Sequence, residues 1–166
     1  MSDHMKEVPP AAVLLGREVV SVDAKSGEVQ LRFLADRQFA NRHGTVQGGM
    51  LAAMLDSATG NAVMASLPPD RTAVTTRLDT TFVKPAALGP LTANARLVMH
   101  DERSALAEAE LLDSSGQIVA RERATRRVRG PRSGLSYRAV QPRRARSARP
   151  ARPGARWRST DPTRQA

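Results

Sequence analysis

One stretch of the chain concentrates the residue types that could do chemistry on a carbonyl group. It reads NRHGTVQGGMLAAMLD and occupies residues 41–56. Gly48 and Gly49 open a predicted helix there. The free backbone N–H groups at such a helix start, with the positive end of the helix dipole, can hold an oxyanion. The absence of side chains on both glycines would let a carbonyl group approach closely.

Asp56 is the residue in this stretch that could act as a base or a nucleophile. It lies in the middle of an otherwise apolar helix, where a carboxylate is costly to bury unless it has a task. It could instead cap a neighbouring element or pair with an arginine such as Arg77. Neutral hydrogen bonds to a carbonyl group or to water could come from Asn41, Gln47 and Thr75. By themselves, Asn41 is typical of a turn and Thr75 of a strand.

The helix predicted at residues 48–67 is apolar or small on nearly every side, which is typical of a helix buried all round. Pro68 and Pro69 end it. Segments with period-two alternation on both sides predict strands at residues 16–23, 27–35, 73–86, 91–101, 104–116 and 117–128. The Ala- and Glu-rich segment 104–116 is ambiguous with helix. The order predicts an α+β domain in which an antiparallel sheet of five or six strands wraps one long central helix.

The composition limits the classes of protein that fit. The chain has 166 residues, enough for one domain with its own core, and it has no Cys, which excludes disulfides, thiolate nucleophiles and Cys-rich zinc sites. Its three His show no metal-ligand spacing, so we expect neither a metal nor another cofactor. No apolar run approaches the ~20 residues of a membrane span, and the first residues do not form a signal peptide. We therefore expect a soluble, cytoplasmic protein.

The net charge of +10 belongs almost entirely to the C-terminal end. Residues 130–166 contain ten Arg and one acid, whereas residues 1–129 hold 16 basic and 15 acidic residues. We expect a flexible N-terminus at residues 1–10, a folded domain at residues 11–129 and a disordered Arg- and Pro-rich tail at residues 130–166. Charge alone could bring that tail to nucleic acid or an anionic membrane, but it has no recognition fold. We favour a dispensable extension, with neither specific nucleic acid nor membrane as a partner.

The stretch 41–56 resembles the motif of the PaaI-like acyl-CoA thioesterases, the phenylacetyl-CoA group of the hotdog fold. That family carries an Asn, a Gly three residues later, usually His-Gly-Gly, and then an acidic residue inside the following helix. The matching residues in this chain are Asn41, Gly44, Gln47, Gly48, Gly49 and Asp56. The sequence FVKPAALG at residues 82–89 and the order of strands are also similar, so the resemblance covers about residues 10–128.

The resemblance implies hydrolysis of an acyl-CoA thioester to the free acid and CoA. In that family's mechanism the N–H of Gly48, helped by Gln47, would hold the thioester carbonyl oxygen. Asp56 would act on water as a general base or attack directly as a nucleophile. Asn41 and Thr75 would orient the carbonyl group and the water.

One departure from the family pattern keeps a second function open. The usual His before Gly-Gly is Gln47 in this chain, and a Gln can donate a hydrogen bond but cannot act as an acid or base near neutral pH. The alternative is a non-catalytic acyl-CoA-binding hotdog protein. A hydratase of the same fold is disfavoured because those enzymes typically place a His in the helix, and residues 48–67 contain none.

The spacing of the two principal groups predicts a shared active site. Gly48 and Asp56 are eight residues apart, which is ~12 Å along one helix. A base must come within ~3 Å of the proton it takes, directly or through one water. If both groups act on one thioester, they must come from different subunits, so we expect a symmetric homodimer, or a dimer of dimers, with two shared sites.

Further residues are assigned to the substrate by their positions. The acyl group is expected to lie against small and aliphatic residues of the helix and the strand after it: Gly49, Met50, Met54 and Val83. The phosphates of CoA are expected near Lys84, at a strand end, and Arg103, in a turn.

Overall fold

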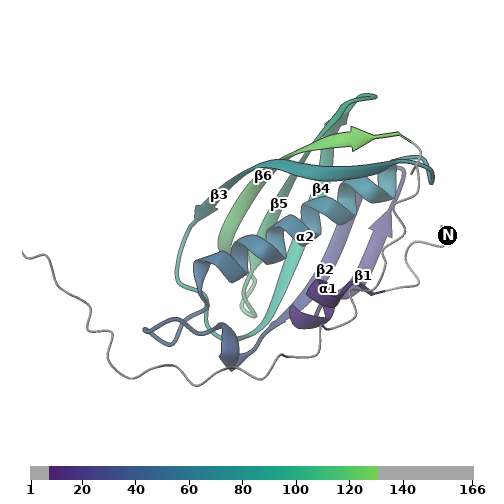
Figure 1. The fold of residues 1–166 in the computed structure, drawn as a ribbon. Helices are drawn as coiled ribbons and strands as arrows, with labels where there is room; N and C mark the ends of the chain where they lie inside the picture. Colours follow the sequence, from purple (N-terminus) through teal and green to yellow (C-terminus); the bar gives the residue numbers. More distant parts are fainter. Residues whose placement is uncertain (1–7, 131–166) are drawn as a thin grey trace, which may run out of the picture. The chain divides into compact units, whose positions relative to one another are not determined.

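The structure, a computed structural model, describes residues 8–130 and contains one six-stranded antiparallel sheet with a long helix, α2, against one face (Figure 1). The strand order is β1-β2-β4-β5-β6-β3. The elements are α1 Pro10–Leu14, β1 Glu18–Asp23, β2 Glu28–Ala35, the 3-10 helix η2 Arg37–Phe39, α2 Gly48–Ser66, β3 Thr72–Phe82, β4 Gly89–His100, β5 Ser104–Leu112 and β6 Ile118–Arg129. The predicted α+β hotdog architecture is confirmed.

Helix α2 begins at Gly48, as predicted, and ends at Ser66, one residue before the predicted end. Pro68 and Pro69 follow at once and cannot continue the helix. Its sheet-facing side is buried: Leu51, Met54, Leu55, Ala58, Thr59, Ala62 and Val63. The other side is half-exposed in the single chain, so the prediction of a helix buried all round is met on one side only.

Small side chains on the inner face of the sheet let α2 pack closely against it. On β5 the inward positions include Ala105, Ala107 and Ala109, all almost fully buried. On β6 two alanines, Ala120 and Ala124, alternate on that face with charged residues. The core therefore consists largely of helix side chains packed against alanines and a few large apolar residues.

The six predicted strands all form, with differences at their ends. β3 stops at Phe82, whereas the sequence predicted a strand that reached residue 86. Pro85, in the part that does not form, has no N–H to continue a ladder. The segment that was ambiguous with helix forms β5, because β4 and β6 pair with it on both sides. Tertiary pairing thus overrides the helical propensity of Ala and Glu.

Two short elements were not predicted. Helix α1 packs Ala12 and the following Leu15 into the core, and η2 does the same with Phe39. Residues 1–7 and 131–166 lie outside the described residues, and the predicted flexible N-terminus and Arg-rich tail fall almost entirely there. None of the described helices is both long and apolar enough to span a membrane.

Strands β1 and β3 form the two edges of the sheet. The β3 edge carries three exposed apolar side chains, Val74, Leu78 and Phe82. β3 and α2 lie side by side (Figure 1). Leu78 and Phe82 are on the same face of the sheet as α2, because they pair with the inward-facing Ala124 and Ala120 of β6, whereas Val74 pairs with the outward-facing Arg127.

Candidate active site

Asp56 lies midway along α2, and its two carboxylate oxygens have different surroundings. Oδ1 accepts hydrogen bonds from Thr75 Oγ1 at 2.8 Å and from Arg126 Nη2 at 2.7 Å. Oδ2 has no hydrogen-bond donor among the described residues. The side chain is 39% exposed, so the free oxygen is accessible while the other is fixed.

Thr75 reaches Asp56 because β3 is irregular at that point. The register of β3 against β6 shifts between Thr75 and Arg77, so Thr76 is an extra residue in the pairing. Such a bulge re-aims side chains and is common beside active sites. Thr75 is predicted to orient the carbonyl group or water, and in the structure its hydroxyl donates to the carboxylate of Asp56.

Arg126 is the second partner of Asp56, and it is buried, with 7% of its surface exposed. Its Nη2 donates to the Asp56 backbone oxygen at 2.6 Å as well as to Oδ1, and to Thr59 Oγ1 at 3.1 Å. A Cβ added at Gly60 would lie 3.1–3.2 Å from three guanidinium atoms. Only a glycine at this point of α2 leaves the guanidinium its full space. Arg77, suggested from sequence as a partner for Asp56, pairs with Asp79 instead.

Glu122 is a buried acid on the inner face of β6, and only 3% of its surface is exposed. Thr80 Oγ1 donates to its Oε2 at 2.9 Å, and Thr59 Oγ1 lies 3.4 Å from its Oε1. Burial raises the pKa of Glu122 from 4.5 to about 7, and the negative charge of Asp56 adds to the rise. The hydrogen bonds from the two threonines and the charge of Arg126 act in the lowering direction but do not outweigh burial.

The N-terminus of α2 presents free amides, as the sequence predicted. Within the described chain, the N–H groups of Gly48 and Gly49 have no hydrogen-bond acceptor, while those of Met50 and Leu51 donate to the Gln47 carbonyl oxygen. A Cβ at Gly48 would lie 3.3 Å from the Phe82 ring, whereas one at Gly49 would meet nothing within 4 Å. The geometry leaves room for an oxyanion at this helix end.

The loop before α2 is held together by Asn41. Its Oδ1 accepts from the backbone N–H groups of His43 and Thr45, and its Nδ2 donates to Thr45 Oγ1 at 2.8 Å. Gly44 turns the chain with φ 76°, a conformation that favours glycine. Gln47 is the N-cap residue, is exposed, and makes no side-chain cap hydrogen bond. Asn41 therefore shapes the loop, and the Gln47 amide is available to a ligand.

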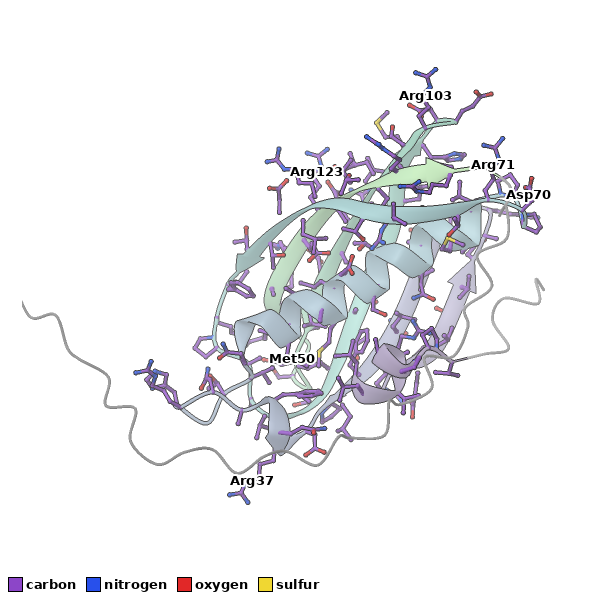
Figure 2. All side chains as sticks on the ribbon, in the orientation of Figure 1. Arg37, Met50, Asp70, Arg71, Arg103 and Arg123 are labelled. Atoms are coloured by element: carbon purple, nitrogen blue, oxygen red, sulfur yellow. The ribbon has the colours of Figure 1, made fainter. Side chains whose placement is uncertain are left out.

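The residues assigned to the acyl group differ in accessibility. Met50, at the N-terminal end of α2, is half-buried (Figure 2). Val83, after β3, is exposed. Met54 is fully buried in the core of the single chain. The first two can line a surface pocket, and Met54 can support it from behind.

The two residues assigned to the CoA phosphates, Lys84 and Arg103, differ in whether an acidic side chain already occupies them. Lys84 forms an ion pair with Asp113 at 2.7 Å and bonds to Gln117. The hydrogen bond from Lys84 contributes most to a pKa of Asp113 well below its usual range. Arg103 is exposed at the turn between β4 and β5 (Figure 2). Arg103 is the more accessible cation.

Arg126 and Glu122 were not selected from the sequence. The signal that could have found them is the period of β6: Ala120, Glu122, Ala124, Arg126 and Val128 share one face, so two charged residues alternate with apolar ones on the buried side. Among the described residues, no cluster of His and acidic side chains is suited to a metal ion.

Comparison with known proteins gives consistent similarities. A family model described as the thioesterase superfamily matches residues 43–120. A phenylacetic acid degradation-related protein from Ralstonia eutropha JMP134 is 36% identical, with a TM-score of 0.71, over 73% of this chain and 91% of that one. A mutant of the phenylacetic acid degradation protein PaaI from Thermus thermophilus is 27% identical, with a TM-score of 0.64, over 72% and 98%. Escherichia coli PaaI, at 24% identity and a TM-score of 0.70 over 77% and 90%, shares the fold. A search of curated proteins found no match.

Proposed function

This chain belongs to the thioesterase superfamily, and we propose that it hydrolyses an acyl-CoA thioester to a free acid and CoA, with Asp56 as its catalytic carboxylate. The observation that carries the proposal is the asymmetry of that carboxylate. Oδ1 is fixed by two donors and Oδ2 is free on a half-exposed helix face. A base or nucleophile needs such an accessible oxygen in a fixed direction.

The reaction has two forms that use the same oxygen. As a general base, Oδ2 takes a proton from water while the water oxygen bonds to the thioester carbon. The C–S bond then breaks, and the proton held by Asp56 passes to the sulfur, so that CoA leaves as the thiol and the carboxylate is regenerated. As a nucleophile, Oδ2 bonds to that carbon itself, CoA leaves, and water cleaves the resulting anhydride to regenerate Asp56. In both forms the carbonyl oxygen becomes negative and is stabilised by the Gly48 N–H, with Gln47 as an additional donor.

The active unit in this proposal is a homodimer. Gly48 and Asp56 are separated by ~12 Å along α2, too far for both to contact one thioester group. The half-exposed side of α2 and the exposed Leu78 and Phe82 of β3, on the same face of the sheet, support a partner subunit at this face. Each site would combine Asp56 of one subunit with Gly48 of the other, and two dimers would associate into a tetramer in the cytoplasm.

The substrate in this proposal lies between the two helices. Gly49, Met50 and Val83 contact the acyl group, while Arg103 and Lys84 are the cations offered to the CoA phosphates. Lys84 would have to exchange its ion pair with Asp113 for a phosphate. The names of the similar proteins make phenylacetyl-CoA the first acyl group to test.

Release of free thiol from a panel of acyl-CoA thioesters tests the proposed activity. We expect hydrolysis by the wild type, and a loss of about 10²–10⁴-fold in kcat for Asp56→Asn and Asp56→Ala, with CoA binding retained. A protein that binds acyl-CoA and hydrolyses none of the panel would be the non-catalytic binder, and Gln47 is the residue that keeps this alternative open.

Mixing two inactive variants tests the shared site. Asp56→Asn removes the carboxylate, and Gly48→Pro removes the amide at the first helical position, where the backbone is compatible with proline because Gln47 already has an extended ψ of 130°. The added Cβ would lie 3.3 Å from the exposed Phe82 ring, which must move slightly, so thermal unfolding checks that this variant is folded. If the site is shared between subunits, a mixed dimer has one intact site and regains activity. If both groups act within one chain, every chain in the mixture carries a defect and no activity returns.

A further inference from the structure

The inner face of β6 carries a buried cluster that the proposed reaction does not yet use. Its members are Arg126 and Glu122, with Thr59 of α2 and Thr80 of β3 as their hydrogen-bond partners. It contacts Asp56 through Arg126, which donates to Oδ1 and not to the free oxygen Oδ2.

Arg126 fixes the orientation of Asp56. One nitrogen, Nη2, donates to both the backbone oxygen and the carboxylate Oδ1 of Asp56, at 2.6 and 2.7 Å. A donor that holds the main chain and the side chain of one residue together restricts its rotamer. Thr75 adds a second donor to the same oxygen, so the whole restraint acts on Oδ1.

The position of Arg126 is poor for stability, which favours a role in the site. Its Nε is buried and has no hydrogen-bond partner among the described residues. An unsatisfied buried donor is destabilising, and a buried ion pair is itself weak support for a fold. Helix α2 accommodates the guanidinium only because residue 60 is a glycine.

Asp56 and the cluster together contain two acids and one cation, and the cation, Arg126, contacts Asp56. Glu122 contacts hydroxyl groups and none of the Arg126 nitrogens. Opposite Glu122, β5 presents Ala109 and β3 presents Thr80, so among the described residues the charged groups that face it are Asp56 and Arg126. A neutral Glu122 gives the cluster no net charge, and its raised pKa agrees with this distribution.

We propose that Arg126 and Glu122 are a positioning pair: Arg126 holds Asp56 with Oδ1 fixed and Oδ2 free, and Glu122, while it is protonated, leaves the guanidinium to Asp56. The inference rests on the proposed function of Asp56. When Glu122 ionises, a second anion competes for the guanidinium, and Asp56 loses its fixed orientation.

Steady-state kinetics test the Arg126 half of the pair. Arg126→Gln is expected to lower kcat by about 100-fold while KM changes little, because the substrate is bound but the reacting oxygen is misplaced. Arg126→Lys should recover part of the loss by returning the charge. The matched control is Arg123→Gln on the outer face of the same strand, with kcat unchanged. Folded Arg126→Gln enzyme with wild-type kcat overturns the inference, even where Asp56→Asn is inactive and the proposed function stands.

The pH profile and a carboxyl titration test the Glu122 half. Wild-type kcat should fall as pH rises through about 7, and Glu122→Gln should remove that fall while keeping wild-type activity at pH 6.

NMR of 13C-labelled glutamate measures the Glu122 titration without any turnover. We expect a midpoint near 7 that moves down in Asp56→Asn, since the neighbouring negative charge is lost. A midpoint near 4.5, or an unchanged midpoint in Asp56→Asn, overturns the pair. If the wild type cleaves no thioester, the proposed function fails separately, and the titration still decides whether Glu122 holds the proton.

Discussion

The two faces of β6 carry the same residue types and put them to different uses. On the outer face, Arg121 and Arg123 pair with Glu110 and Glu108 of β5, and both arginine side chains are more than half exposed (Figure 2). On the inner face, Arg126 pairs with Asp56 at 2.7 Å and its side chain is 8% exposed. An arginine–carboxylate pair by itself therefore does not identify a functional site. The exclusion of solvent from the pair and the geometry of the carboxylate that accepts the hydrogen bond identify it.

The physical difference between the faces is the surrounding medium. Water and salt screen the outer pairs, and such exposed pairs contribute about 0–1 kcal/mol each. Under α2, alanines and helix atoms replace water, so charges interact more strongly and an unpaired acid prefers to be neutral. The outer face is thus suited to solubility and sheet pairing, and the inner face to control of charge at one carboxylate.

The largest expected contrast is in the pH dependence of stability. Glu122 has a pKa near 7 when folded and 4.5 as its ordinary value, so the folded state binds more protons between these pH values. The free energy of unfolding should therefore fall by about 3 kcal/mol as pH rises from 4.5 to 7. Glu122→Gln should remove this slope and Glu108→Gln, on the outer face, should keep it, as measured by urea denaturation at several pH values. A slope that survives Glu122→Gln would contradict the assignment.

Truncating one arginine on each face compares the two media directly. Arg126→Met should destabilise the fold by about 2 kcal/mol, because it strips Oδ1 and the backbone oxygen of Asp56 of a donor in a largely dry environment. Arg123→Met should cost about 0.5 kcal/mol or less, because water replaces its ion pair. Denaturation midpoints at fixed pH give both values, and equal costs would remove the distinction between the faces.

Gly60→Ala tests whether α2 is shaped around the inner arginine. Alanine is the better helix former by about 1 kcal/mol, so a helix surface position would gain stability. At residue 60 the added Cβ meets the guanidinium at 3.1–3.2 Å, and we expect a net loss of about 1 kcal/mol instead. Gly49→Ala is the stability control, since its Cβ meets nothing within 4 Å and should not destabilise. Thermal unfolding of both variants decides, and a stabilised Gly60→Ala would show that the guanidinium moves freely.

The smallest effect is expected for an outer ion pair. A double-mutant cycle on Arg121 and Glu110, with both residues changed to alanine, should give a coupling energy of about 0.3 kcal/mol that declines further in 1 M salt. A coupling above about 1 kcal/mol would mean that the outer face is less exposed in the assembled protein than in the single chain.

Much of the fold and part of the site follow from local patterns. The glycine pair, the apolar run and Pro68-Pro69 predicted both ends of α2 to within one residue. Period-two alternation predicted all six strands, and the position of Asp56 inside the helix indicated a carboxylate with a task. Short elements such as α1 were missed because their few apolar residues make too little pattern.

The partners of Asp56 could not be predicted in the same way. Arg77 is nearer in sequence and was the suggested partner, yet it lies on the exposed face of β3 and pairs with Asp79. Thr75 and Arg126 meet the carboxylate only because β3 and β6 pair in one register, interrupted by a bulge at Thr76. Shifting a strand by one residue would turn each of these side chains to the opposite face of the sheet.

Local sequence was sufficient for the bounds of α2 to within one residue, for most of the strands, and for the amide-rich helix start and the single acid within α2. Each of these depends on neighbouring residues and on the periods of helix and strand. The folded arrangement was needed to show which arginine reaches Asp56, which of its oxygens stays free, and that Glu122 is buried beside this pair with a raised pKa. The contact between Asp56 and Arg126 joins segments about 70 residues apart, and it forms in a region from which solvent is excluded. Both the distance and the solvent exclusion arise only when the helix packs onto the sheet.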